Sequence, residues 1–221
     1  MDIEWRIMKI ISINIAKPER LKIPDTDIQT GIYKKPIHTK VRVTKFGIEG
    51  DTIVDQNVHG GLDQAVYIYS KEDYEWWSQQ IGKEIAPGTF GENLTISGFD
   101  VDDFVVGDRL QINNVLLEIS APRTPCFKLA AVMNDATFGR QFAKAAKPGA
   151  YARVLTEGEL EIGNTITLVK TELHYPTVKE IFIAWHSKNP SLDIFTRALQ
   201  APLAIVHRGK IQQWVDNALL D

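Results

Sequence analysis

The sequence is poor in cysteine, with a single thiol, Cys126, among 221 residues. One thiol excludes an internal disulfide, a Cys-x-x-Cys redox pair and a zinc site built from several thiolates. It also excludes an iron–sulfur cluster of the usual kind, because several cysteine thiolates hold such clusters. Any sulfur chemistry in this protein therefore uses Cys126, either alone or together with a second molecule.

Long apolar runs and a strong net charge are also missing. No apolar run approaches the roughly 18 residues of a membrane span, and the start, MDIEW, carries acids where a secretory signal needs basic residues. We therefore expect a soluble, cytoplasmic protein without membrane association. The net charge of −3 argues against a nucleic-acid binder that works through a broad basic surface.

Common catalytic motifs are absent as well. The chain has no phosphate loop, no Gly-x-Gly-x-x-Gly, no Gly-x-Ser-x-Gly elbow and no His-Glu-x-x-His. The histidines are too scattered for a metal site that is local in sequence: His38, His59, His174, His186 and His207. Function must therefore come from residues that the fold brings together.

Up to about residue 170 the sequence consists of short strand-like runs broken by Gly, Pro, Asn and Asp. This spacing predicts a mainly β domain, a mostly antiparallel sheet curled into a barrel, with a few helices. The expected strands cover residues 9–15, 40–45, 65–69, 93–96, 109–112, 115–119, 151–155 and 165–169.

Two helices are expected inside this β-rich part, and we assign their aromatic faces to the core rather than to a ligand site. The first follows the N-cap Ser70, and the second starts near Asn134 or Asp135 and ends before Pro148. The predicted buried faces are Tyr74, Trp77 and Ile81 in the first helix, and Phe138 and Phe142 in the second.

After Val169 the apolar period changes from two to 3.6, which predicts three helices, the first opened by a capping box of Thr177 and Glu180. We divide the chain into a barrel domain, residues 1–170, and a small C-terminal three-helix domain, residues 175–221. A DNA-binding helix-turn-helix is an alternative, but the last helix offers only Arg208 and Lys210 as cations, so packing or partner docking is favoured. The candidate buried positions are Val178, Ile181, Phe182, Trp185, Leu203, Val206, Ile211, Trp214 and Val215.

The surroundings of Cys126 suggest chemistry. Arg123 and Lys128 flank the thiol and favour its thiolate, which is the nucleophile and metal ligand. Pro122 and Pro125 fix φ on the approach to the sulfur. The alternative is that Cys126 is a small buried hydrophobe.

Three further segments hold candidate binding residues. The adjacent Lys34 and Lys35 suit a phosphate, although a solvated turn explains them too. His59 precedes a glycine pair that lets backbone approach a ligand, although a lone histidine is more often structural. Asn93 can donate and accept hydrogen bonds at a turn that enters a strand.

Taken in order, these segments resemble the MOSC family, named after the C-terminal domain of molybdenum cofactor sulfurases. The helical tail resembles the extra C-terminal domain of a bacterial branch linked to hydroxylaminopurine resistance. The chain departs from the family pattern at residues 52–54 and at Asn164, and the family-like first strand begins right after Met8, so Met1 and Met8 are both candidate starts. The matching segments are KIISIN (9–14), TGIYK (30–34), GD (50–51), HGG (59–61), FGENL (90–94), GD (107–108), RTPC (123–126) and YARV (151–154).

The resemblance implies a β-barrel that binds molybdenum cofactor, with Cys126 as a thiolate ligand to the metal. The implied activity is a detoxifying, two-electron reduction of small N-hydroxylated compounds such as nucleobases or amines. Cys126 and His59 are the implied catalytic residues. The implied cofactor-binding residues are Lys34, Gly60, Gly61, Asn93, Arg123, Thr124 and Arg153.

Because the chain has neither a cysteine set for an iron–sulfur cluster nor a Rossmann fingerprint, we expect a separate electron-donating reductase as partner. One alternative is a sulfur carrier, in which Cys126 holds a persulfide delivered by a cysteine desulfurase. Another is a non-catalytic module that binds the pterin cofactor and docks a partner through its tail. A homodimer is compatible with each, and we expect no pyridoxal phosphate site and no nucleic-acid partner.

Overall fold

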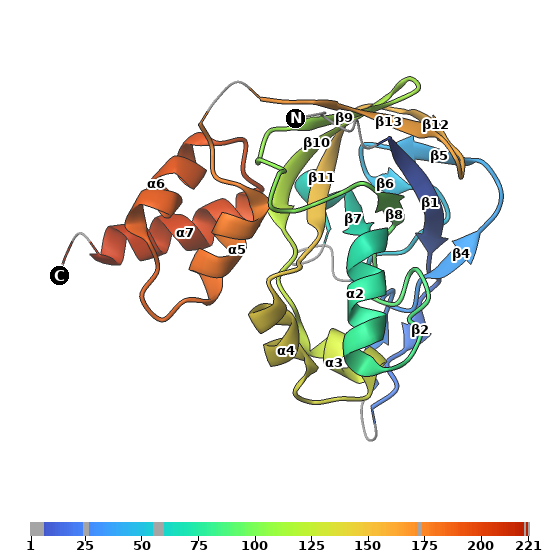
Figure 1. Ribbon diagram of the computed structural model, residues 1–221, viewed down its shortest axis with the longest axis horizontal. Helices are drawn as coiled ribbons and strands as arrows, with labels where there is room; N and C mark the ends of the chain where they lie inside the picture. The colour runs from blue at the N-terminus through green and yellow to red at the C-terminus, as the bar shows by residue number, and fades with distance from the viewer. Residues whose placement is uncertain (1–6, 24–26, 55–59, 172–173, 219, 221) are drawn as a thin grey trace.

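The computed structural model describes residues 7–23, 27–54, 60–171, 174–218 and 220. Seven strands in the described ranges form a closed barrel in the order β13-β9-β10-β11-β7-β8-β1, and pairing of β1 with β13 closes it (Figure 1). Neighbouring strands are antiparallel except for the parallel pair β7 and β8. The barrel strands are β1 (Met8–Ile15), β7 (Val66–Ser70), β8 (Leu94–Ser97), β9 (Arg109–Ile112), β10 (Val115–Pro122), β11 (Ala150–Thr156) and β13 (Thr165–Val169).

The mainly β prediction is confirmed, and each of the expected runs contains a strand. Five very short strands, two or three residues each, were not expected: β2 (Glu19–Arg20), β3 (Gln29–Thr30), β4 (Lys35–Ile37), β6 (Gly47–Ile48) and β12 (Gly158–Leu160). The run 40–45 became β5 (Val41–Thr44), which pairs with β6 and β12 in a small separate sheet. Strands this short show no period in sequence and depend on their neighbours for hydrogen bonds.

Inward-facing aliphatic side chains fill the barrel. Ile10, Ile68, Leu94, Leu117 and Ile119 are at most 1% exposed and belong to one continuous apolar cluster. Burying each such side chain contributes about 1.5–3 kcal/mol. The pattern of alternate residues along each strand therefore sets which face of the sheet turns inward.

Helices cover the barrel at one end and on one side (Figure 1). The first three lie together at the lower end in that view, and the last three form a group beside β10. The helices are α2 (Lys71–Ile81), α3 (Phe127–Met133), α4 (Phe138–Ala145), α5 (Val178–His186), α6 (Leu192–Gln200) and α7 (Ile205–Ala218), with a short 3-10 helix, η1 (Leu62–Gln64).

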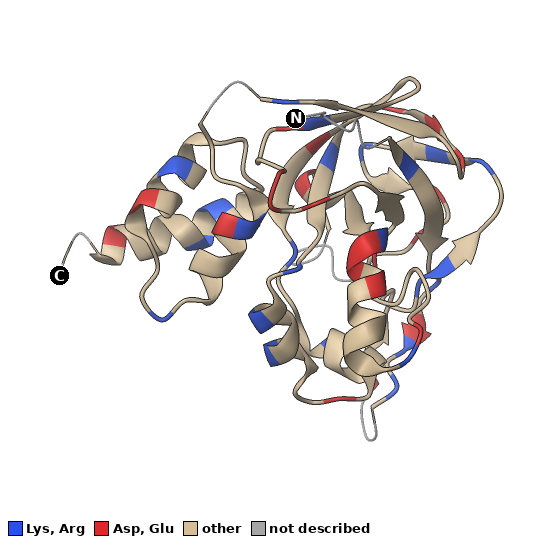
Figure 2. Ribbon diagram, in the orientation of Figure 1, with Lys and Arg blue, Asp and Glu red and all other residues tan. Residues whose placement is uncertain are grey.

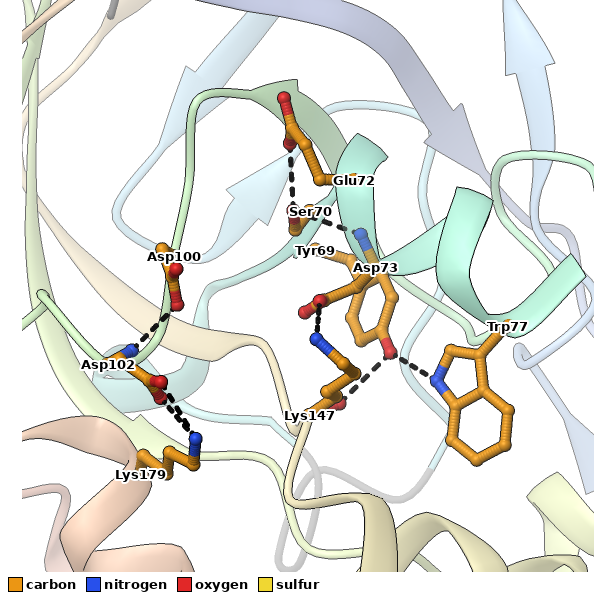
Figure 3. Close-up of polar contacts among 9 residues, drawn as sticks. All are labelled: Tyr69, Ser70, Glu72, Asp73, Trp77, Asp100, Asp102, Lys147 and Lys179. Carbon is orange, nitrogen blue, oxygen red and sulfur yellow. Dashed lines mark hydrogen bonds and ion pairs between the residues drawn. The ribbon is translucent and has the colours of Figure 1, made fainter. Parts of the chain in front are cut away.

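Helix α2 begins as predicted, because the Ser70 hydroxyl accepts a hydrogen bond from the Asp73 backbone N–H at 3.3 Å (Figure 3). Tyr74 and Trp77 are buried, but Ile81 is 39% exposed, so its assignment to the core was wrong. Ile81 is the last residue of the helix, and the buried residues of α2 all lie in its first two turns.

The start of α2 is tied to the segment that enters β11 (Figure 3). Lys147 Nζ lies 2.5 Å from an Asp73 carboxylate oxygen, and the Tyr69 hydroxyl donates to the Lys147 carbonyl at 3.0 Å. Trp77 Nε1 in turn donates to the Tyr69 hydroxyl at 2.9 Å. Burial raises the pKa of Asp73, and the bond from Lys147 opposes this shift. These contacts fix α2 against β7 and the segment that leads into β11.

The helix expected from near residue 134 or 135 is α4, which starts at Phe138, and α3, a helix that was not expected, ends just before it. Asn134 has φ of 50° and ends α3, and Asp135 Oδ1 accepts a hydrogen bond from the Thr137 N–H at 2.7 Å before α4 starts. The predicted start was therefore wrong, because both residues serve the boundary between helices. Phe138 and Phe142 are buried in the core, as predicted.

The three tail helices share a core with the barrel. The capping box of Thr177 and Glu180 is present at the start of α5, as predicted. Val106 and Ala121 of the barrel belong to the same apolar cluster as the buried tail residues. Val206 is 40% exposed, so its assignment to the core was wrong. The buried tail residues of this cluster are Ile181, Ala184, Phe195, Ala198, Ala201, Leu203, Ala204 and Ile211. The division into two domains stays a prediction.

Charges of both signs are spread along the barrel and the tail (Figure 2). Arg208, a candidate nucleic-acid contact in sequence, donates to the carbonyls of Leu199 and Ala201 at 2.5 Å each. It therefore closes the C-terminal end of α6, which favours a packing role. Within the described ranges, none of the helices combines the length and apolar character needed to cross a membrane.

Candidate functional site

A pocket that contains about 590 Å³ of empty space, its open mouth included, lies among β3, η1, β7, β11, the start of α3 and the loops before β4 and β8. It brings together segments that are up to about 120 residues apart in sequence. Tyr67, Phe90 and Tyr151 give it apolar surface, and residues 52–54, where the chain departs from the family pattern, line it too. Its polar and charged lining residues are Thr30, Lys34, Thr52, Gln64, Asn93, Arg123, Cys126 and Lys128.

Four of the proposed site residues meet in this pocket: Lys34, Asn93, Arg123 and Cys126. Gly60, Gly61, Thr124 and Arg153 are not among the residues that line it; Gly61 lines a neighbouring hollow beside Ile53. The Arg153 guanidinium is 3.0 Å from Asp63 and 2.9 Å from Glu118, within the barrel wall. His59 lies outside the described residues, so its role stays a prediction.

On one side, the lining residues Lys34 and Asn93 are bonded to Asp51, which does not itself line the pocket, in a complete polar network that we call the Asp51 wall (Lys34, Asp51 and Asn93). Lys34 Nζ is 2.5 Å from both carboxylate oxygens of Asp51, and both side chains are almost fully buried. Asn93 Nδ2 donates to Asp51 at 2.8 Å, and Asn93 Oδ1 accepts from the Tyr67 N–H at 3.1 Å. Burial lowers the pKa of Lys34, and its attraction to Asp51 opposes that shift. The charge of Lys34 is therefore already compensated by the protein.

Glu92 is a buried acid that holds the loop before β8 in place. Its carboxylate accepts hydrogen bonds from the Gly88 N–H at 2.6 Å, the Thr95 hydroxyl at 2.7 Å and the Tyr74 hydroxyl at 2.8 Å. Burial raises the pKa of Glu92, and the hydrogen bond from Gly88 opposes this. These bonds hold the loop so that the neighbouring Asn93 enters the pocket in one orientation.

The other side of the pocket is different, and we call it the Gln64 wall (Gln64, Arg123, Cys126 and Lys128). Gln64 is 2% exposed and Arg123 is 4% exposed. Within the part of the chain that the structure describes, neither amide atom of Gln64 has a hydrogen-bond partner, nor does Arg123 Nη1. Buried polar groups are normally paired, so these exceptions mark groups that a ligand can satisfy.

Arg123 is held by aromatic rings and lies near the thiol. Its guanidinium lies 5.6 Å from the Tyr67 ring and 5.5 Å from the Phe142 ring. Burial lowers the pKa of Arg123, but electrostatic attraction by Tyr67, Cys126 and Tyr151 outweighs it, so the net shift is upward. Burial raises the pKa of Tyr151 to about 12, opposed by Arg123. Arg123 thus stays charged beside Cys126.

The charges in the lining favour an anion. Lys34, Arg123 and Lys128 line the pocket, and within its described lining there is no Asp or Glu. Asp51 compensates Lys34, which leaves Arg123 and Lys128 as the cations best placed for a negatively charged group. A guanidinium with an unpaired N–H is suited to phosphate or carboxylate.

The donor set suits a metal that brings most of its own ligands. Among the described residues, no group of three or more His, Cys, Asp or Glu side chains is placed to hold a metal ion. The pocket offers one cysteine sulfur, a soft donor, beside cations and unpaired hydrogen-bonding groups. These residues fit molybdenum cofactor, in which a dithiolene holds the metal and a phosphate carries negative charge.

Sequence reasoning did not identify Gln64, Tyr67 or Tyr151 as site residues. Tyr67 and Tyr151 are cross-strand partners on β7 and β11, with ring centroids 5.3 Å apart. Gln64 follows the matched HGG segment by three residues. This closeness was the signal in the sequence that could have identified it as a site residue. Its lack of partners becomes visible only when the surrounding side chains are placed.

The chain is similar to a known domain family and to several known proteins. The model of the MOSC domain matches residues 55–167. An uncharacterized Bacillus subtilis protein, YflK, is 32% identical over 72% of each chain, and Escherichia coli YiiM is 28% identical over 71% of each. The crystal structure of YiiM from Geobacillus stearothermophilus superposes with a TM-score of 0.78 at 28% identity, covering 94% of this chain and 99% of that one. A Gibberella moniliformis protein named reductase is 28% identical over 80% of this chain, but the match spans 32% of its own length.

Proposed function

The chain belongs to the MOSC domain family, and on that premise we propose that it is a molybdenum-cofactor-dependent oxidoreductase that reduces N-hydroxylated compounds. The observation that carries the proposal is that Cys126 and the buried, partly unpaired Arg123 line the same pocket. The name of the Gibberella moniliformis reductase supports an oxidoreductase activity. The apolar and hydrogen-bonding surfaces of the pocket suit a planar organic ligand.

Each residue of the Gln64 wall has a place in this proposal. Cys126 provides the thiolate ligand to the metal, and Arg123 and Lys128 hold the phosphate of the cofactor. Lys34, the cation proposed from sequence, instead keeps Asp51 and Asn93 in position because its charge is already compensated. When bound, the cofactor supplies a two-electron reduction in which N–OH, two electrons and two protons give N–H and water.

The protein's own contribution to this reaction is orientation and exclusion of water. Tyr67, Phe90 and Tyr151 provide apolar surface, on which a flat ligand can lie. Tyr151, with a pKa raised to about 12 by burial, keeps its proton at neutral pH and can donate a hydrogen bond. The electrons come from a separate reductase, because the single cysteine excludes a cluster of the usual kind in this chain.

Metal and pterin analysis of the wild type beside Cys126→Ser tests the proposal. Both are purified from a host that makes the cofactor, with Lys35→Ala, an exposed cation next to Lys34, as matched control. We expect about one molybdenum per wild-type and control chain, and at least a tenfold loss of metal and of N-hydroxylamine reduction in Cys126→Ser. Full metal content together with full activity in that variant would contradict the proposal. A gain of one labile sulfur on Cys126 in metal-free protein, after incubation with a cysteine desulfurase, would instead support a sulfur carrier.

A further inference from the structure

Gln64 is the polar side chain of the pocket that the fold leaves least satisfied. It is 2% exposed, and in the described ranges both Oε1 and Nε2 lack a hydrogen-bond partner. Leaving a buried donor or acceptor unpaired costs free energy that a folded protein normally avoids. An amide that is buried, unpaired and part of a pocket lining is therefore a candidate ligand contact.

The backbone that carries Gln64 is firmly held. Its own N–H donates to the Gly61 carbonyl at 3.2 Å, within η1. The adjacent Asp63 is fixed three times: its carboxylate lies 3.0 Å from Arg153 Nε, it accepts from the Ile205 N–H at 2.9 Å, and its carbonyl accepts from the Ser120 hydroxyl at 2.5 Å. This anchoring from β10, β11 and α7 fixes the backbone that carries the amide, so that binding has to order only the side chain of Gln64, which lowers the entropic cost of binding.

A primary amide selects a particular chemistry. Oε1 accepts and Nε2 donates, so the complement is a group with a donor and an acceptor side by side, such as a lactam, an amidine or an aminopyrimidine edge. We propose that Gln64 recognises such an edge on a planar ligand in the pocket. Tyr67 and Phe90 contribute apolar surface for the flat ring, and Arg123 provides a cation for an anionic substituent.

This inference deepens the proposed function and rests on it for the ligand's identity. Two parts of the proposed chemistry carry such an edge: the pterin ring of the cofactor, and an N-hydroxylated nucleobase as substrate. An N-hydroxylated arylamine lacks the paired donor and acceptor. The pterin content of the protein and its preference between nucleobase and arylamine substrates therefore show whether Gln64 contacts the cofactor or the substrate.

The test variant is Gln64→Leu, which keeps the size of the side chain and removes both polar atoms. Its matched control is Gln111→Leu on β9, where Nε2 already donates to the carbonyls of Asn113 at 2.6 Å and Val115 at 3.1 Å. In ligand-free protein, from a host unable to make the cofactor, we expect Gln64→Leu to raise Tm by about 2–6 °C, because an unsatisfied amide is removed. Gln111→Leu should lower Tm, because a satisfied amide is lost.

The cofactor arm compares pterin and molybdenum per chain in proteins from a host that makes the cofactor. If Gln64 recognises the pterin, pterin content in Gln64→Leu falls at least tenfold and Gln111→Leu matches the wild type. If Gln64 instead recognises the substrate, the pterin content of Gln64→Leu stays at the wild-type level. KM for an N-hydroxylated nucleobase then rises by about 10–100-fold, while KM for an N-hydroxylated arylamine does not change.

Failure of this inference differs from failure of the proposed function. If wild-type protein carries no pterin and no molybdenum, the proposed function fails, and titration of ligand-free protein with a free pterin and with a free nucleobase still tests Gln64. The inference is overturned if Gln64→Leu lowers Tm as Gln111→Leu does. It is also overturned if Gln64→Leu leaves pterin content, both KM values and the binding of the free rings at wild-type values.

Discussion

Both walls of the pocket contain a buried cation and a buried side-chain amide, and they differ in whether these groups have hydrogen-bond partners. On the Asp51 wall, Lys34, Asp51 and Asn93 satisfy one another at 2.5–2.8 Å. On the Gln64 wall, Gln64 and Arg123 are as deeply buried yet retain atoms without a partner among the described residues. The first wall is complete without a ligand, and the second is not.

This difference teaches how to separate structural from binding residues in one pocket. A buried network that satisfies itself contributes stability, and removing a member leaves an uncompensated group. A buried group without a partner costs stability in the ligand-free protein, so its presence in the lining of a pocket favours a role in binding. Three expected outcomes test this comparison directly, and a fourth concerns a buried polar group outside the two walls.

The largest effect should come from Asp51→Ala. This change leaves the Lys34 ammonium buried without its counter-charge and removes an acceptor from Asn93. We expect a loss of about 3–5 kcal/mol in the free energy of unfolding, measured by urea denaturation. The control is Asp193→Ala, which removes the exposed i,i+4 pair with Arg197 and should cost at most about 0.5 kcal/mol. Equal, small losses in both variants would mean that the Asp51 wall is not a structural unit.

The next effect concerns a buried polar group outside both walls. His207 on α7 is 3% exposed, its ring centroid lies 5.0 Å from that of Trp185, and burial lowers its pKa from the usual 6.5 to about 4. Below pH 6.5 the imidazole of His207 therefore binds a proton in the unfolded chain, whereas in the folded chain it stays neutral down to about pH 4. Stability is fully present above pH 6.5 and falls by about 3 kcal/mol as pH drops to 4.

Unfolding by urea at pH 7.5 and pH 5, in the wild type and in His207→Leu, measures this contribution. The wild type should lose about 2 kcal/mol more than the variant between these values. Carboxylates titrate in both proteins, so the difference isolates His207. Parallel pH dependence in the two proteins would mean that the folded ring protonates freely.

A third outcome tests the amide of the complete wall. Asn93→Leu removes the acceptor for the Tyr67 N–H and the donor to Asp51. We expect a loss of about 1–3 kcal/mol in unfolding free energy. This sign is opposite to the one expected for Gln64→Leu, although both changes replace a buried side-chain amide by leucine. Stabilisation by Asn93→Leu would remove the distinction between the walls.

The smallest effect on stability should come from Arg123→Met. The ring contacts of this buried guanidinium, worth about 2 kcal/mol each when desolvated, offset the cost of burying the charge with an unpaired N–H. We expect the unfolding free energy to change by no more than about 1 kcal/mol, while pterin content after expression with the cofactor falls at least tenfold. A loss comparable with that of Asp51→Ala would place Arg123 among the structural residues.

Much of the fold follows from local patterns. Alternating apolar residues predict the barrel strands, and Ser70 and Thr177 mark helix starts because each caps the helix that follows. Helix α3 was missed because its N-cap position is Cys126, whose side chain makes no capping hydrogen bond. The short strands, such as β4 and β6, were missed because two or three residues show no period.

The candidate site was only partly accessible from sequence. Lys34, Asn93, Arg123 and Cys126, which the resemblance assigned to the site, line one pocket, and their roles toward a cofactor stay predictions. The resemblance gave Lys34 a role toward the phosphate. The ammonium group of Lys34 is instead bonded to Asp51, 17 residues away in sequence, and is therefore less available to a ligand. The resemblance also gave Arg153 a role toward the cofactor, although its guanidinium is engaged by Asp63 and Glu118.

The sequence by itself determined the barrel, the cores of most helices and the one sulfur that any chemistry can use, because period, caps and composition are written along the chain. Only the tertiary structure decided which buried polar groups are satisfied. That outcome depends on side chains from distant segments meeting at hydrogen-bond distance, as Lys34, Asp51 and Asn93 do, or on their failing to meet, as around Gln64.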